Sequence, residues 1–104
     1  MELTSIGKVI EIEGNTTKLL IDKEYQSELT GVETLDKLLV VYWVSRPEGK
    51  PFYEEKGVFA TTYTGRPNPL GIEVAELVTV EDNLLMVNGL SARIDADIID
   101  LRPV

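Results

Sequence analysis

The pattern of apolar and polar positions along the chain predicts short strands and no convincing amphipathic helix. Runs rich in β-branched residues are bounded by glycine, asparagine and aspartate, which is typical of strands joined by tight turns. The expected strands cover residues 3–13, 16–22, 38–44, 58–62, 70–80, 84–87 and 96–101. Many short strands separated by turns indicate an all-β fold, either a barrel or a sandwich.

Some of these segments support more specific expectations. The unbroken apolar run 38–44 is typical of a strand buried on both faces. The alternation in 70–80 shifts phase near Glu76 and Leu77, where we expect a β-bulge. The run 84–87 is short and apolar and could form a sheet edge that needs covering. Between the strands, we interpret 23–30 as a loop with room for a helical turn, and 46–56 as an exposed loop.

Composition narrows the classes of function. The 104 residues fit a single domain spanning 1–104, and the formal net charge is −8. Because nucleic-acid binding draws on Lys and Arg, this charge argues against a broad electrostatic grip on RNA or DNA. The chain has no cysteine or histidine, which excludes disulfides, thiolate metal sites and Ser-His or Cys-His catalysis. With no apolar run near about 20 residues and no signal-peptide pattern, we expect a soluble cytoplasmic protein.

The segment 57–72 carries the strongest candidate chemistry. At its centre, Arg66-Pro67-Asn68-Pro69 is stiff, because each proline fixes its own φ and restricts the residue before it. Arg66 and Asn68 therefore project from a segment with little freedom to lose, as a small-molecule site requires. The alternative is that this stretch only connects two strands.

The same segment resembles the signature of the TrmO family, also described as the YaeB or TsaA-like domain. The resemblance rests on Gly57-Val58-Phe59-Ala60-Thr61 followed by Arg66-Pro67-Asn68-Pro69-Leu70-Gly71-Ile72, and it extends to the first, central and last predicted strands. It implies a β-barrel that uses S-adenosylmethionine to methylate N6-threonylcarbamoyladenosine next to the tRNA anticodon. It also implies a homodimer, because such sites commonly lie near a dimer interface.

Site residues follow from the resemblance position by position. The implied cofactor contacts are Thr62, Arg66, Asn68, Gly71, Ile72 and Asp95. Asp95 is also the first candidate for a catalytic carboxylate, followed by Asp97. The alternative is that Asp95, Asp97 and Asp100 form a solvated face of the last strand. No spacing of acidic residues suggests a metal site.

Departures from the family pattern leave a second function open. Thr62 stands where the family usually has an arginine at the cofactor, and a hydroxyl cannot replace that charge. The family's usual histidines are also missing. The chain could therefore be a non-catalytic module that binds S-adenosylmethionine or a nucleotide, or that offers an interaction surface, having lost methyl transfer.

Overall fold

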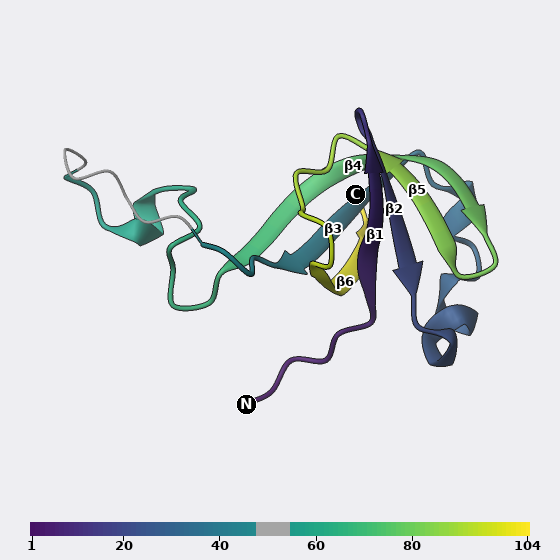
Figure 1. Cartoon of the computed structure of the whole chain (residues 1–104), viewed down its shortest axis with the longest axis horizontal. Helices are drawn as coiled ribbons and strands as arrows, with labels where there is room; N and C mark the ends of the chain where they lie inside the picture. Colours follow the sequence, from purple (N-terminus) through teal and green to yellow (C-terminus); the bar gives the residue numbers. More distant parts are fainter. Residues whose placement is uncertain (48–54) are drawn as a thin grey trace.

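The computed structural model describes residues 1–47 and 55–104. In this part of the chain, antiparallel strands close into a barrel in the order β1-β2-β5-β4-β3-β6 (Figure 1). The elements are β1 (Gly7–Glu13), β2 (Thr16–Ile21), β3 (Lys37–Trp43), β4 (Leu70–Glu81), β5 (Leu84–Asn88) and β6 (Asp97–Pro103), with 3-10 helices η1 (Lys23–Leu29), η2 (Val32–Thr34) and η3 (Val58–Ala60). The prediction of an all-β barrel is confirmed.

Inward-facing side chains from every strand fill the barrel. Because successive residues of a strand point to opposite faces, every second apolar position reaches the interior. Ala75 of β4 is 1% exposed, and the larger apolar side chains that are at most 1% exposed are Val9, Leu19, Ile21, Leu38, Val40, Leu85, Val87 and Ile98. Full burial of one such side chain contributes about 1.5–3 kcal/mol, so this layer is the main source of stability.

Several local predictions are confirmed. The turn at Gly14 joins β1 to β2, and Asp82 turns β4 into β5 with a positive φ of 55°. The register of β4 against β5 shifts between Leu77 and Thr79, where the loss of alternation predicted a bulge. Residues 23–29 form the helical turn for which the predicted loop left room.

Two predictions about strand environment are wrong. In β3, Leu38, Val40 and Tyr42 are buried while the alternate positions are only partly covered, so this strand is not buried on both faces. The outer wall of a barrel of this size has no second layer over it, and the apolar residues there remain partly exposed. β5 forms no edge, because barrel closure pairs it with β2 on one side and β4 on the other.

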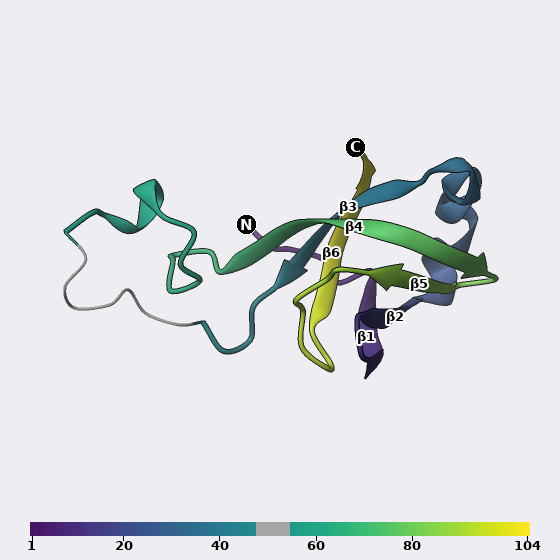
Figure 2. The same ribbon diagram turned by 90° about the horizontal axis from the view of Figure 1, so that it is seen from above.

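The predicted strand at 58–62 is also wrong, because Val58–Ala60 forms η3. The main-chain N–H of Ala60 donates to the carbonyl of Gly57, and the hydroxyl of Thr61 donates to the carbonyl of Val58. These bonds close a turn within the segment. Figures 1 and 2 show residues 55–69 lying beyond the ends of β3 and β4, away from the barrel. Of the predicted exposed loop 46–56, residues 48–54 lie outside the described residues, and those described are exposed.

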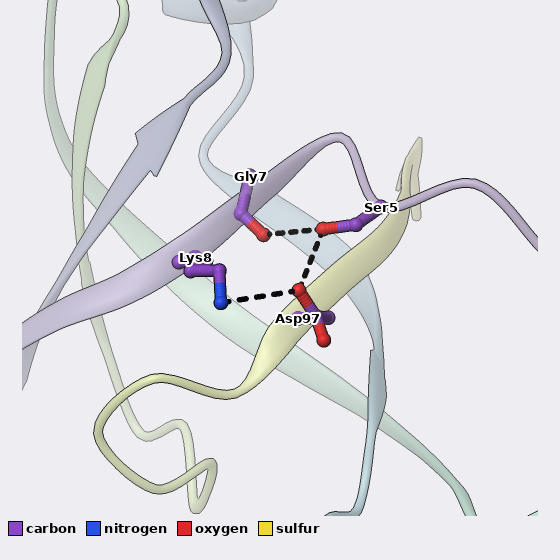
Figure 3. Close-up of polar contacts among 4 residues, drawn as sticks. All are labelled: Ser5, Gly7, Lys8 and Asp97. Atoms are coloured by element: carbon purple, nitrogen blue, oxygen red, sulfur yellow. Dashed lines mark hydrogen bonds and ion pairs between the residues drawn. The ribbon is translucent and has the colours of Figure 1, made fainter.

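The barrel closes along a short seam between β1 and β6. The two strands pair at Gly7 with Ile98 and at Lys8 with Asp97, and a main-chain hydrogen bond from the N–H of Val9 to the carbonyl of Ala96 lies beside them. Side chains reinforce this seam: the hydroxyl of Ser5 lies 2.8 Å from Asp97 Oδ1 and 3.0 Å from the carbonyl oxygen of Gly7 (Figure 3). Lys8 Nζ lies 3.8 Å from the same carboxylate. Asp97 thus joins the two strands at the point where the barrel shuts.

Candidate ligand-binding site

A hollow of about 470 Å³ lies at the mouth of the barrel, where β3 ends and β4 begins. β3 and β4 supply its inner wall, the segment 61–66 supplies a second side, and Ser91 reaches it from the connection between β5 and β6. Its volume is in the range of small-molecule sites, about 300–1,000 Å³. The wall combines hydroxyl, guanidinium and carboxylate groups with apolar surface, which suits a ligand of mixed polarity.

Tyr42 and Glu73 meet on the inner wall. The Tyr42 hydroxyl donates a hydrogen bond to the Glu73 carboxylate, and the N–H of Ser91 lies 3.2 and 3.3 Å from the two Glu73 oxygens. Tyr42 is only 8% exposed. Burial, reinforced by the hydrogen bond to Glu73 and its charge, raises the pKa of Tyr42 above its ordinary value, so the hydroxyl remains a donor at neutral pH.

Gly71 makes room for this arrangement. It lies opposite Tyr42 in the pairing of β3 with β4, and a Cβ at this position would collide with the tyrosine ring. The glycine predicted as a cofactor contact therefore also serves packing at the mouth of the barrel. The two uses are compatible, since Gly71 itself lines the hollow.

Arg66 holds the segment around it in place. Its Nη1 lies 2.9 Å from the carbonyl oxygens of both Thr61 and Tyr63. The arginine therefore ties down neighbouring backbone, as expected of a purely architectural residue, yet it also lines the hollow. The far end of the same segment is attached to the barrel by a 2.7 Å hydrogen bond from the N–H of Val44 to the carbonyl of Pro69.

The structure brings together four of the six predicted cofactor contacts. Thr62, Arg66, Gly71 and Ile72 line the same hollow, although the Ile72 side chain is 60% exposed on the outer wall. Asn68 faces a different hollow, of about 340 Å³, which it shares with Trp43 and Asp97.

Asp95 lies apart from these four residues. It is exposed, has a φ of 67°, and donates from its N–H to the carbonyl of Val9 on β1. Among the described residues, the lining of the hollow beside Arg66 does not include it. Its predicted contact with a cofactor and its predicted catalytic role stay predictions.

A third hollow, of about 230 Å³, adjoins the hollow beside Arg66 and shares Tyr42, Thr64 and Ser91 with it. Arg46 and Arg93 line this third hollow. Three arginines from separate parts of the chain therefore gather at one end of an otherwise acidic molecule. Sequence reasoning missed this group, together with Glu73 and Ser91. No local signal marks it, because only closure of the barrel brings these residues together.

Comparison with known proteins agrees with this architecture. Crystal structures of TrmO superpose on the whole chain: the one from Pseudomonas aeruginosa gives a TM-score of 0.81 at 20% identity, and a second gives 0.83 at 20%. The chain covers 55% and 57% of those two proteins. At this identity the similarity establishes the fold.

Sequence relatives are closer. Two proteins of Archaeoglobus fulgidus, named a probable S-adenosyl-L-methionine-binding protein and an S-adenosyl-L-methionine-binding protein, are 34% and 35% identical over 95 residues. These matches cover 85% and 83% of the chain but 26% and 67% of the relatives, so the chain spans from a quarter to two-thirds of their length. The family model described as the tRNA-methyltransferase O N-terminal domain matches residues 8–104. The chain therefore belongs to the TrmO N-terminal domain family.

Proposed function

We propose that the chain binds S-adenosylmethionine in the hollow beside Arg66. The observation that carries this proposal is the convergence of Thr62, Arg66, Gly71 and Ile72 on one hollow of about 470 Å³. The names of the Archaeoglobus fulgidus relatives, which refer to binding of the same compound, support it. S-adenosylmethionine bound there would supply a methyl group carried on a sulfonium.

The residues of the hollow suit the polar parts of such a ligand. In the described part of the chain, the hydrogen bonds of the Arg66 side chain both use Nη1, so the N–H groups on Nε and Nη2 remain for an anionic group such as a carboxylate. Thr62 offers a hydroxyl, and Gly71 contributes main chain to the lining of the hollow. Because Nη1 is anchored, the guanidinium is oriented before the ligand arrives.

For the reaction, we propose methyl transfer to N6-threonylcarbamoyladenosine in tRNA, in the cytoplasm. Methyl transfer depends mainly on holding donor and acceptor in line, so the chain can contribute by positioning. Arg46 and Arg93 beside the hollow give an acidic protein a local anion-binding surface for RNA phosphates. Asp95 remains the proposed carboxylate for deprotonating the acceptor.

The second candidate is a module that binds S-adenosylmethionine without transferring its methyl group. Two observations favour it: Thr62 stands at a position where the family usually has arginine, and the chain has no histidine to act as a base. The two candidates share the ligand and differ only in turnover.

Calorimetric titration with S-adenosylmethionine up to millimolar concentration tests the binding proposal. We expect saturable heat for the wild type and an affinity about tenfold lower for Arg66→Ala, because one charge-assisted contact is lost. The variant should melt close to the wild type, because the Arg66 hydrogen bonds stay within its own segment. Arg102→Ala is the matched control, since Arg102 pairs with Asp100 on β6.

Absence of saturation in the wild type would exclude both candidates. An Arg66→Ala variant that unfolds more readily yet binds normally would assign Arg66 to architecture alone. If the wild type binds, transfer of labelled methyl to tRNA carrying the modified adenosine separates the enzyme from the non-catalytic module.

We also propose that the protein is a homodimer. β3 and β4 present apolar residues on the outer wall of the barrel, where Leu39 lies opposite Val74 and Val41 opposite Ile72. Val74 is 49% exposed and Ile72 is 60% exposed. An apolar surface of this kind next to a ligand site is typical of a protein interface. Among the described residues there is no helix of the length and apolar character needed to span a membrane.

A further inference from the structure

Glu73 is an acidic residue on the inner face of the barrel wall. Its inward neighbours on β4 are Gly71 and Ala75, and Ala75 is only 1% exposed. Glu73 itself is half-buried, so its carboxylate loses part of its hydration and needs hydrogen-bond donors from the protein or a ligand. The Tyr42 hydroxyl and the Ser91 N–H meet this need in part, and they fix the position of the carboxylate on the wall of the hollow.

Within the described part of the chain, no ion pair involves Glu73. The ion pairs among residues 1–47 and 55–104 are Lys8 with Asp97, Lys18 with Glu11, and Arg102 with Asp100. Arg66 lines the same hollow but directs Nη1 to the carbonyls of Thr61 and Tyr63. A carboxylate has about four lone-pair sites, and the two donors from Tyr42 and Ser91 leave part of that capacity unused.

The hollow therefore holds a fixed negative charge and a fixed positive charge, on Glu73 and Arg66. S-adenosylmethionine has the complementary charges, because it carries an ammonium, a sulfonium and a carboxylate. We propose that the Glu73 carboxylate pairs with a cationic group of the ligand in this hollow, an inference that rests on the proposed binding of S-adenosylmethionine. Glu73 would then select the charged ligand over neutral nucleosides that share only its adenosine portion.

Three ligands titrated against the wild type and Glu73→Gln test this inference. S-adenosylmethionine has both cations, S-adenosylhomocysteine retains only the ammonium, and 5′-methylthioadenosine has neither. Glutamine keeps the size of the side chain and can still accept from Tyr42, so the substitution removes mainly the charge. We expect Glu73→Gln to lower the affinity for S-adenosylmethionine about tenfold and to change that for methylthioadenosine less than about twofold.

S-adenosylhomocysteine identifies the cation. A loss for both charged ligands assigns the contact to the ammonium, and a loss for S-adenosylmethionine alone assigns it to the sulfonium. The matched control is Glu76→Gln, which removes the same charge from an exposed position on the same strand and should leave all three affinities unchanged. Equal effects of Glu73→Gln on all three ligands, or no effect on any, would overturn the inference.

A measurement on Arg66→Ala, which lacks the other charged contact to the ligand, covers the case in which Glu73→Gln does not fold. In this variant the ratio of the affinities for S-adenosylmethionine and methylthioadenosine should still fall as the salt concentration rises, because salt screens the charges paired at Glu73. A constant ratio would overturn the inference. If the wild type binds S-adenosylmethionine but Glu73 does not favour it over methylthioadenosine, only this inference is refuted. If the wild type does not bind S-adenosylmethionine, the proposed function is refuted as well.

Discussion

Gly71 and Tyr42 show how one position can serve both packing and binding. The tyrosine ring occupies the space that a Cβ on residue 71 would take, and its hydroxyl holds Glu73. The sequence led to Gly71 through the signature segment, because a glycine between a rigid loop and a strand suggests close approach of a ligand. It gave no sign of the ring, because Tyr42 lies about thirty residues earlier on a strand that only the fold places opposite.

Replacing Gly71 by alanine should therefore destabilise the barrel. We expect Gly71→Ala to lower the free energy of unfolding by about 2 kcal/mol, since the new methyl group forces the Tyr42 ring to move. Urea denaturation followed by tryptophan fluorescence measures this change. Gly57→Ala is the control, because nothing lies within 4 Å of its Cβ position and its φ of −65° suits alanine. Similar midpoints for the two variants would contradict this packing of Tyr42.

At the scale of elements, sequence pattern was informative where a strand has one buried face. The predicted strands 16–22 and 96–101 agree with β2 and β6 to within two residues, and the loss of alternation in 70–80 located the bulge in β4. The prediction failed at 58–62, since β-branched and aromatic residues form a strand only when a neighbouring strand is available. The sequence pattern also did not predict the short pairing of β1 with β6, because the length of this pairing depends on how the whole sheet curves.

This short pairing makes the Asp97 contacts measurable. We expect Asp97→Ala to speed amide hydrogen exchange at Val9 about fivefold, because the Val9 N–H donates across the seam to the carbonyl of Ala96, next to β6. The loss of the hydrogen bond to Ser5 is worth about 1 kcal/mol. NMR measures these exchange rates, and the amides between β3 and β4 should exchange at the same rate in the variant as in the wild type. Asp100→Ala is the control, because Asp100 pairs with Arg102 on its own strand; equal rates in both variants would assign Asp97 no part in closing the barrel.

At the scale of the whole molecule, the distribution of charge matters more than the total. The net charge of −8 argues against nucleic-acid binding over a large part of the surface. Arg46, Arg66 and Arg93 nevertheless line two adjoining hollows at one end of the barrel. These arginines are at least twenty positions apart in sequence, so no count of basic residues along the chain could have found them together.

The proposed dimer is a property of the outer wall of this molecule. We expect Val74→Glu to make the protein monomeric at micromolar concentration, because it places a charge within the apolar surface of β3 and β4. Sedimentation velocity measures the change. The control is Ile12→Glu on β1, which is 42% exposed and belongs to the opposite wall in the order of strands. A wild type that sediments as a monomer, or a Val74→Glu variant that remains dimeric, would rule out this interface.

The segment that carries Arg66 is held together from within. Arg66 and Thr61 direct their side chains to carbonyl groups of the same segment, and the N–H of Val44 secures its end to the barrel. Mutations between 58 and 68 can therefore accumulate without disturbing the buried layer of the strands. For evolution, this separation allows the choice of small molecule to diverge quickly while the scaffold is inherited almost unaltered. For protein engineering, it marks the place where a new specificity could be grafted.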